Sequence, residues 1–533
     1  MKKIFRKAVC ALMALVMTVP LAACGGGEGE RKQPKYDPVS PDSIKIVVSN
    51  LGFGVEWAYD IAAAFMTTHP GKSVTVEPTV MSAALISQLE AGSNIGDIAM
   101  FNDDALWKKW RLGVMTQLDD VVSATPDGET QTIAEKMNHT LIEAYRQADD
   151  HFYSVPWINE NGGFVYNKTS LNTLLGAGNW TLPKTTHEML ALCERIKTAG
   201  GYGFVWNSAY LGHEVFAAQY NGLETDEKYR DGLYWTGSEW KLSDNAQCVG
   251  QNTGYLRTLG FWEKVIKSYS HQYSQNMTHI YAQSAWSGIP YAGDSKLSVF
   301  MPNGDWTYNE TKDYLDETQA EVGFMRAPVL SDMVETLELY REGSTPFAAL
   351  SAEKQNEYDA VLRAVIDWVD GGETGAIPTY KGSAVSAADL ARIRSARQLI
   401  GGKCQAEAFI PANSTKKELA KEFLIFMASD MAIDLFSKAT YGLSPFIGPE
   451  NYGNVQFDVP FMQDVLNELI AAPVKVVHRY NALRQAGYFL PKHYSFSGGL
   501  SIKSAQKFFE DEITRFQTDW SVILQNAGLA SEV

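Results

Sequence analysis

Short apolar strands alternate with amphipathic helices where the folded part of this chain begins. Residues 44–50 and 74–76 are rich in β-branched residues, and residues 97–101 form a third short apolar run. Between these runs, apolar side chains from Trp57 to Phe65 and from Leu85 to Leu89 recur at helical spacing. Strands that alternate with helices form a parallel sheet covered by helices on both faces, so the sequence predicts an α/β fold.

The residues that follow the predicted strands are polar and aromatic. Ligands of open parallel sheets bind beyond the carboxyl ends of the strands, so we expect Trp57, Asn102 and Asp103 to contact a ligand. Capping of the next helix explains Asn102, Asp103 and Asp104 equally well, because their side-chain oxygens accept hydrogen bonds from free N–H groups. Both interpretations stay open.

Residues 1–24 have the layout of a bacterial lipoprotein export signal. Four basic residues precede an apolar run over residues 8–21, and the sequence Leu21-Ala22-Ala23-Cys24 follows. The run is shorter than the roughly 20 residues that a spanning helix needs, so we expect residues 1–23 to be cleaved. The tetrapeptide resembles a lipobox, which implies that Cys24 becomes the first mature residue, carries a diacylglycerol and anchors the protein to the membrane.

Composition limits the partners of the mature chain. Residues 24–42 are rich in glycine, proline and charge, and we expect a disordered tether there. The net charge is −16, and loss of the basic signal residues makes it about −20, so the surface repels nucleic acid. With 45% hydrophobic residues, the chain has enough apolar material for the cores of two lobes.

Three cysteines remain after export and lipidation: Cys193, Cys248 and Cys404. They allow at most one disulfide, and the sequence does not decide whether any two of them pair. Stability therefore has to come from hydrophobic burial.

Several segments along the chain resemble one protein family. Residues 152–168 read FYSVPWINENGGFVYNK, in which an aromatic residue and a Val-Pro pair precede a polar run and an apolar strand ending in Tyr-Asn-Lys. Residues 183–188 read PKTTHE, residues 303–306 read NGDW, and residues 410–424 read IPANSTKKELAKEFL. In this order the segments resemble the extracellular solute-binding proteins of family 1, the maltose-binding-protein-like group of ABC sugar importers.

This resemblance implies a two-lobed α/β fold, the type II periplasmic-binding-protein-like fold, with hinge strands and a ligand cleft between the lobes. We expect residues 43–160 and 322–440 in the first lobe, and residues 161–321 and 441–533 in the second.

We place the crossings between the lobes near residues 157–163, 321–324 and 441–445. An insertion over about residues 331–405 includes an amphipathic helix from Ala352 to Val369, and we assign it to the first lobe without a predicted role.

The resemblance also implies that Glu160 contacts a sugar and that Trp306 stacks on one. A sugar site needs flat aromatic rings beside amide and carboxylate groups, because pyranose rings have apolar faces and hydroxylated rims. On this ground we add a further set of candidate residues: Trp157, Asn159, Trp206 and Tyr441. Ordinary core packing is the alternative for each tryptophan.

Catalytic and metal-binding patterns are incomplete. His187-Glu188 and His213-Glu214 begin a zinc-protease pattern, but Ala191 and Ala217 stand where the second histidine is required. We therefore expect a protein that is not an enzyme and has no metal or cofactor.

These features predict a monomeric, lipid-anchored binding protein on the extracytoplasmic face of the cell membrane. It is expected to capture a carbohydrate, most simply an oligosaccharide, and to present it to the permease subunits of an ABC transporter. Two alternatives stay open: the same fold binding another solute such as a polyamine, and a surface lipoprotein that degrades or binds glycans.

Overall fold

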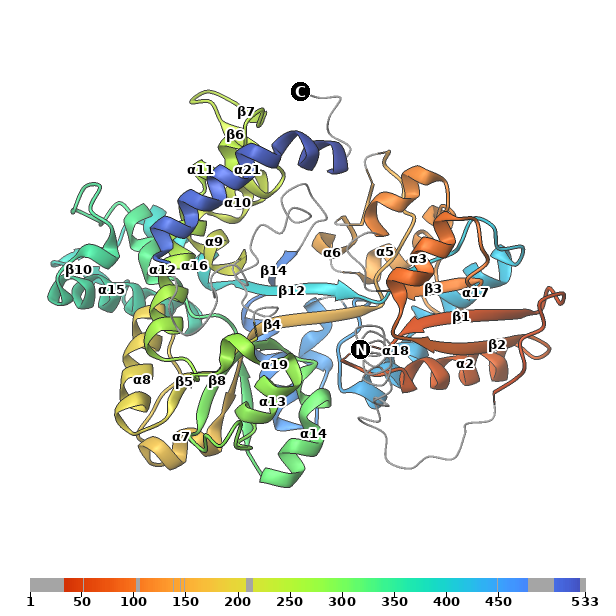
Figure 1. The fold of residues 1–533 in the computed structure, drawn as a ribbon, viewed down its shortest axis with the longest axis horizontal. Helices are drawn as coiled ribbons and strands as arrows, with labels where there is room; N and C mark the ends of the chain where they lie inside the picture. The colour runs from red at the N-terminus through yellow and green to blue at the C-terminus, as the bar shows by residue number, and fades with distance from the viewer. Residues whose placement is uncertain are drawn as a thin grey trace, which may run out of the picture. The chain divides into compact units, whose positions relative to one another are not determined.

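The structure is a computed structural model, and it describes residues 33–50, 52–101, 106–137, 139–143, 145–147, 149–207, 214–447, 449–477 and 503–527. The chain divides into two units, residues 1–34 and 35–533. The helices and strands of the described residues lie in the second unit and are built around two larger sheets (Figure 1).

The first sheet has four strands in the order β13-β3-β1-β2. They are β1 (Ser43–Ser49), β2 (Ser73–Thr79), β3 (Ile98–Phe101) and β13 (Glu407–Phe409). β1 pairs in parallel with β2 and β3, as the alternation of strands and helices predicts. β13 comes from a distant part of the chain and pairs antiparallel with β3.

Helices pack on this sheet through the apolar faces that their sequences predict. α2 buries Trp57, Ile61 and Phe65, and the Trp57 ring lies edge-on to Phe436 at 5.5 Å between centroids. We call this sheet and its helices the first lobe. Its helices are α2 (Glu56–Thr68), α3 (Ser82–Glu90), η1 (Leu106–Leu112), α4 (Asp119–Val122), α5 (Ile133–Lys136), α6 (His139–Glu143), α17 (Lys417–Met427) and α18 (Asp430–Thr440).

The second sheet has the order β14-β12-β4-β8-β5, and β9 also pairs with β4. Its strands are β4 (Ile158–Asn167), β5 (Tyr202–Phe204), β8 (Ser298–Gly304), β9 (Val322–Met325), β12 (Leu399–Gln405) and β14 (Val474–Val477). Two apolar cores cover its faces: Phe164 of β4 belongs to one core and the neighbouring Val165 to the other. This is the alternation expected of a strand buried on both sides.

Helices, a small hairpin and an inserted segment complete the second lobe. The helices are α7 (Lys168–Leu175), α8 (Thr186–Thr198), α9 (Glu214–Asn221), α10 (Leu223–Arg230), α11 (Gln247–Gln251), α12 (Thr253–Ser268), η2 (Ser274–Asn276), α13 (His279–Trp286), α14 (Thr307–Thr318), η5 (Pro449–Asn454), α19 (Pro460–Ala471) and α21 (Ala505–Ala527). The hairpin is formed by β6 (Leu233–Trp235) and β7 (Trp240–Leu242). The inserted segment contains η3 (Ser331–Thr336), η4 (Phe347–Ala349), α15 (Ala352–Asp370), β10 (Thr379–Tyr380), β11 (Ser383–Ala384) and α16 (Ala387–Arg397).

Two segments pass between the two sheets near two of the three predicted crossings. Val155 bridges to Ala408 beside the first sheet, and β4 then enters the second sheet. Residues 441–446 lead from α18 back toward the second lobe, and Leu443 bridges to Asn159. The third crossing differs from the prediction. β9, over Val322–Met325, stays in the second sheet beside β4, and the chain returns to the first lobe only between β12 and β13, at Ala406.

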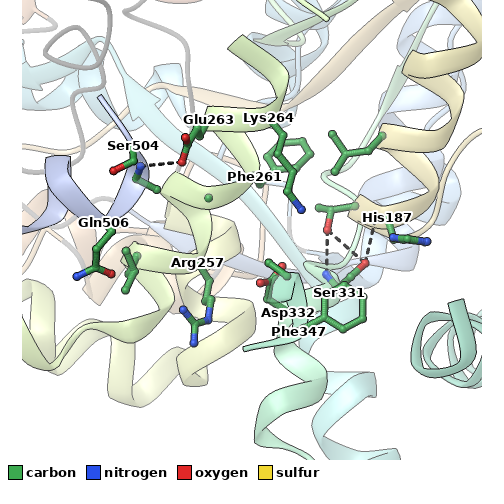
Figure 2. Close-up of a pocket in the computed structure, with 16 residues that line it drawn as sticks. His187, Arg257, Phe261, Glu263, Lys264, Ser331, Asp332, Phe347, Ser504 and Gln506 are labelled. Atoms are coloured by element: carbon green, nitrogen blue, oxygen red, sulfur yellow. Dashed lines mark hydrogen bonds between the residues drawn. The ribbon is translucent and has the colours of Figure 1, made fainter. Parts of the chain in front are cut away.

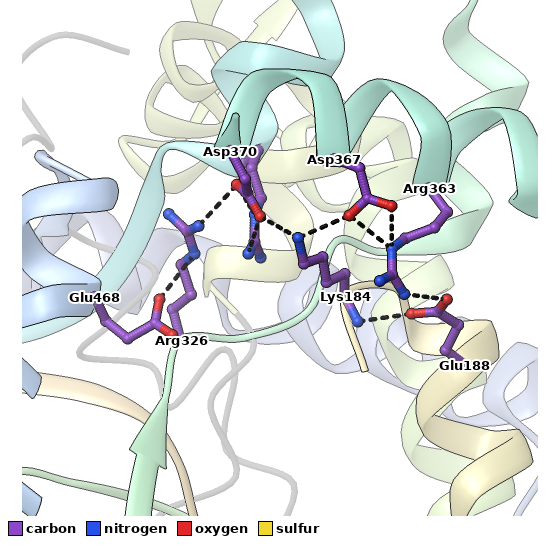
Figure 3. A network of polar contacts seen from close by, with 8 residues as sticks. Lys184, Glu188, Arg326, Arg363, Asp367, Asp370 and Glu468 are labelled. Carbon is purple, nitrogen blue, oxygen red and sulfur yellow. Dashed lines mark hydrogen bonds and ion pairs between the residues drawn. The ribbon is translucent and has the colours of Figure 1, made fainter. Parts of the chain in front are cut away.

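The inserted segment therefore packs on the second lobe, whereas the sequence analysis assigned it to the first. Thr185, just before α8, donates a 2.9 Å hydrogen bond to Asp359 of α15. The carboxyl end of α15 continues this attachment through ion pairs (Figure 3). Lys184 lies 2.7 Å from both Asp367 and Asp370, and Arg326, which follows β9, bridges Asp370 at 3.2 Å to Glu468 of α19 at 3.0 Å.

The pKa of Asp370, at the end of α15, reflects the cations that surround its carboxylate. Burial alone raises the pKa of Asp370, but hydrogen bonds and charge from Arg397 and Lys184, with the charge of Arg326, outweigh burial and lower that pKa to about 2. The Asp370 carboxylate is therefore stabilised in its ionised form by three cations from three segments.

Candidate functional site

The polar run predicted on the crossing strand is buried. Asn159, Glu160 and Asn161 of β4 are 1%, 1% and 0% exposed. Successive side chains of a strand point to opposite faces, so Asn159 and Asn161 share one face and Glu160 lies on the other. Burying a polar group costs free energy unless the group is hydrogen-bonded. The contacts of this run therefore identify the groups that compensate its burial.

Asn161 is paired with Asp305, which directly follows β8. The Asn161 side-chain amide donates to one Asp305 carboxylate oxygen at 2.7 Å, and its backbone N–H donates to the other at 3.2 Å. The Asp305 N–H in turn donates to the Asn161 carbonyl at 3.0 Å. Burial raises the pKa of Asp305 to about 6, although the Asn161 bonds and the charge of Lys475 oppose the rise.

Lys475 of β14 brings a positive charge to the same buried group. It is 4% exposed, and its ammonium donates to the side-chain oxygen of Asn159. Its stem crosses Gly402 of β12 so closely that a Cβ on residue 402 would overlap Lys475 Cε and the carbonyl oxygen of Glu160. We call Asn159, Glu160, Asn161, Asp305 and Lys475 the crossing-strand cluster.

Trp306 extends this cluster to the first lobe. It lies between Asp305 and the start of α14, and its half-buried ring packs against the core of the first lobe. A Cβ added to Gly52, just beyond β1, would lie 3.0 Å from the Cβ and Cδ1 atoms of Trp306. An indole carried by the second lobe therefore lies against the carboxyl end of a strand of the first.

Tyr441 also lies beside the start of α14. It ends α18 in a left-handed backbone conformation with φ of 55°, and its half-buried ring meets Tyr308 edge-on at 6.2 Å. Asn309 donates to the carbonyl of Thr440 at 2.6 Å. The start of α14 is thus held against first-lobe residues at two places.

Comparison with known proteins decides the family. Residues 54–370, more than half of the chain, match the family model described as bacterial extracellular solute-binding protein. The chain belongs to this family. No curated protein matches this solute-binding protein. A solved structure described as a family 1 extracellular solute-binding protein from Bifidobacterium longum subsp. infantis is 16% identical to it, with a TM-score of 0.49 over 91% of this chain and 97% of that chain.

Family membership gives the broad role of this solute-binding protein. It binds a solute outside the cytoplasm, and its family is one of solute-binding proteins. In the part of the chain that the structure describes, no helix combines the length and the apolar character needed to cross a membrane.

The other predicted tryptophans are core residues in this conformation of the solute-binding protein. Trp57, Trp157 and Trp206 are 1%, 4% and 0% exposed. Their indole N–H groups are already used: Trp57 donates to the Gly54 carbonyl at 3.0 Å, Trp157 to Met427 Sδ at 2.7 Å, and Trp206 to Ser270 Oγ at 2.7 Å. Core packing, the alternative left open for each tryptophan, describes this arrangement.

Three predicted residues lie outside the described part of the chain: Cys24, Asn102 and Asp103. The choice between ligand contact and helix capping for the last two stays open.

The pair His187-Glu188, which resembles the start of a zinc-protease motif, has structural contacts. His187 Nε2 lies 2.7 Å from the Asn356 side-chain oxygen, and Glu188 forms a 2.5 Å ion pair with Arg363. Cys193 and Cys248 are buried free thiols, and burial raises the pKa of both. Among the described residues, no group of His, Cys, Asp and Glu side chains is arranged to hold a metal ion.

Asn161 and Lys475 were not predicted as site residues from the sequence. Lys475 carried a signal, because it is the single charge in the otherwise apolar run Val474-Lys475-Val476-Val477. Asn161 stood inside the polar run that was singled out, but its partner Asp305 is 144 residues away.

Proposed function

We propose that this protein captures a carbohydrate, most simply an oligosaccharide, between its lobes and delivers it to the permease of an ABC transporter. The observation that carries the proposal is the position of Trp306. Trp306 directly follows Asp305, whose carboxylate accepts from the Asn161 amide, and its half-buried ring lies against the first lobe. A flat ring beside amide and carboxylate groups suits the apolar faces and hydroxylated rims of sugars.

The proposed cycle uses the crossing strands as hinges. A ligand that contacts both lobes favours the closed arrangement, because it can shift the equilibrium only by its difference in affinity for the two states. The lipobox resemblance supports a lipid on Cys24, which would keep the protein at high effective concentration near its permease.

Binding to purified protein tests the proposal. A thermal-shift screen with mono-, di- and oligosaccharides should raise the unfolding temperature for at least one sugar, because a ligand at 100 times its Kd adds about 2.7 kcal/mol of stability. Spermidine and short peptides in the same screen separate the other solute classes. Release of reducing sugar would reveal a glycan-degrading enzyme instead.

Variants then locate the site by calorimetry with the sugar that binds. We expect Trp306→Ala to weaken binding by roughly 30-fold, since truncation of a central aromatic contact costs about 2 kcal/mol, and Glu160→Gln to weaken it as well. Trp235→Ala is the matched control, because Trp235 is 41% exposed on the β6–β7 hairpin. Unchanged affinity in both folded site variants would show that the cleft lies elsewhere.

A further inference from the structure

A second cavity lies in the second lobe, away from the crossing-strand cluster. It is open to solvent and has a volume of about 230 Å³, and its walls come from α8, α12, η3, η4 and the start of α21 (Figure 2). None of its lining residues belongs to β4, β8, β12 or β14. Two of its walls, η3 and η4, belong to the inserted segment, whose role the sequence left open.

Two of the charged groups around this cavity are already paired. Arg257 of α12 donates to the Glu335 carboxylate at 2.8 and 3.0 Å. Glu263 accepts the backbone N–H of Ala505 at 2.7 Å and forms a 2.5 Å ion pair with Lys267. These bonds hold the walls of the cavity in place. A ligand could bind Arg257 or Glu263 only by breaking them, which costs free energy.

The other two charges have no such partner. Among the residues that the structure describes, neither the Asp332 carboxylate nor the Lys264 ammonium forms an ion pair with another side chain. Figure 2 shows both side chains facing the space between α12 and η3. Burial and the nearby Glu335 charge raise the pKa of Asp332 to about 6, while Lys264 and Arg257 oppose the rise, so the group is mainly ionised at neutral pH.

The remaining surface of the cavity limits the size and shape of a ligand. Phe261 and Phe347 form the apolar part of the wall. Thr186 and Ser331 are hydrogen-bonded to each other, and the Ser331 N–H donates to Thr186 Oγ1 at 2.9 Å. The cavity volume of about 230 Å³ is below the roughly 300–1,000 Å³ of pockets that hold drug-sized ligands. This space suits a molecule with a short apolar body and two opposite charges.

We propose that this cavity is a second ligand site that binds a small zwitterion, a short-chain α-amino acid. Its ammonium would pair with Asp332, its carboxylate with Lys264, and its side chain would pack on Phe347. Each charged end then finds the opposite charge on the protein, and charge-assisted hydrogen bonds of this kind are the stronger class.

Calorimetric titration of the whole protein with L-alanine tests the proposal, with propionate and ethylamine as probes that each lack one charge. We expect L-alanine to bind and each single-charge probe to bind at least roughly ten-fold more weakly, because one charge-assisted bond is lost. Asp332→Asn and Lys264→Gln should each weaken L-alanine binding by a similar factor. Lys264 is exposed, so its variant is expected to fold even if Asp332→Asn does not.

Lys267→Gln is the matched control, one helical turn from Lys264 but already paired with Glu263, and it should bind L-alanine like the wild type. The proposal is overturned if L-alanine does not bind, if propionate or ethylamine binds as tightly, or if the Lys264→Gln protein keeps wild-type affinity. The sugar screen is independent of these outcomes, so failure of one proposal leaves the other standing.

Discussion

At the scale of single residues, the buried carboxylate of Asp305 makes the protein sensitive to pH. Its pKa in the folded protein is about 6, against an ordinary value of 3.8. A group whose pKa is raised by folding stabilises the fold when protonated, and this contribution is lost as the pH rises through the folded pKa. We expect the ionisation of Asp305 to lower the unfolding free energy by about 2 kcal/mol between pH 4 and pH 7.

The Asp305→Asn variant should lack this part of the pH dependence, because its amide is neutral at every pH and still offers an oxygen to Asn161. Urea unfolding of both proteins across this range measures the difference. Asp313→Asn, an exposed change on α14, is the control and should follow the wild type. Equal pH slopes in wild type and Asp305→Asn would contradict the assignment.

The sequence could indicate this group of residues only in part. Glu160, Asn159 and Trp306 were identified from a polar run and from a resemblance, both of which are local signals. The bonds that join the run to Asp305 and Lys475 span 144 and 316 residues, and no local pattern reports such a pairing. The buried tryptophans were predicted as ligand contacts but lie in the core. The local sequence of a tryptophan beside polar residues does not distinguish a core position from a binding site.

At the scale of strands and helices, a single glycine of β12 leaves room for Lys475 of β14 to reach the crossing-strand cluster. The Lys475 side chain passes over Gly402. A methyl group on residue 402 would overlap both the Lys475 side chain and the backbone of β4. We expect Gly402→Ala to lower the unfolding free energy by about 3 kcal/mol, at the upper end of the cost of overpacking, because backbone atoms cannot move aside cheaply.

Gly250→Ala provides the control for this prediction. Gly250 lies in α11, and a Cβ there would meet Ile513 at an ordinary 3.8 Å. Alanine is the better helix former, so this variant should be as stable as the wild type or slightly more stable. Guanidinium unfolding of the variants compares them, and a Gly402→Ala protein as stable as Gly250→Ala would refute the argument.

Elements with strong local periodicity were the predictable part of the fold. The first β-α-β-α-β run and the helix of the insertion appear within a few residues of their predicted bounds, with α15 at Ala352–Asp370. The return crossing was misplaced, because it depends on which strand pairs with β4. The ion pairs that hold the insertion on the second lobe join residues as far apart in the chain as Lys184 and Asp370, so neither feature has a local signal.

At the scale of the whole molecule, the proposed function requires the lobes to approach each other when a sugar binds. A distance probe needs one label on each lobe, and Ser87 of α3 and Thr173 of α7 are exposed positions for cysteine substitution. The native thiols of Cys193 and Cys248 are buried and have raised pKa values, so they should not react with the label.

Saturation with the sugar identified in the screen should shorten the Ser87–Thr173 label distance and lower the radius of gyration in small-angle scattering. Labels at Thr173 and Ala191, both on the second lobe, should keep their separation, since hinge closure moves each lobe as a body. Trp306→Ala should reduce the shortening at a given sugar concentration, because the variant loses a contact that the closed state makes with both lobes. An unchanged distance between the lobes at saturation would mean that the solute is held without closure, and the hinge role of β4 and β12 would then be untenable.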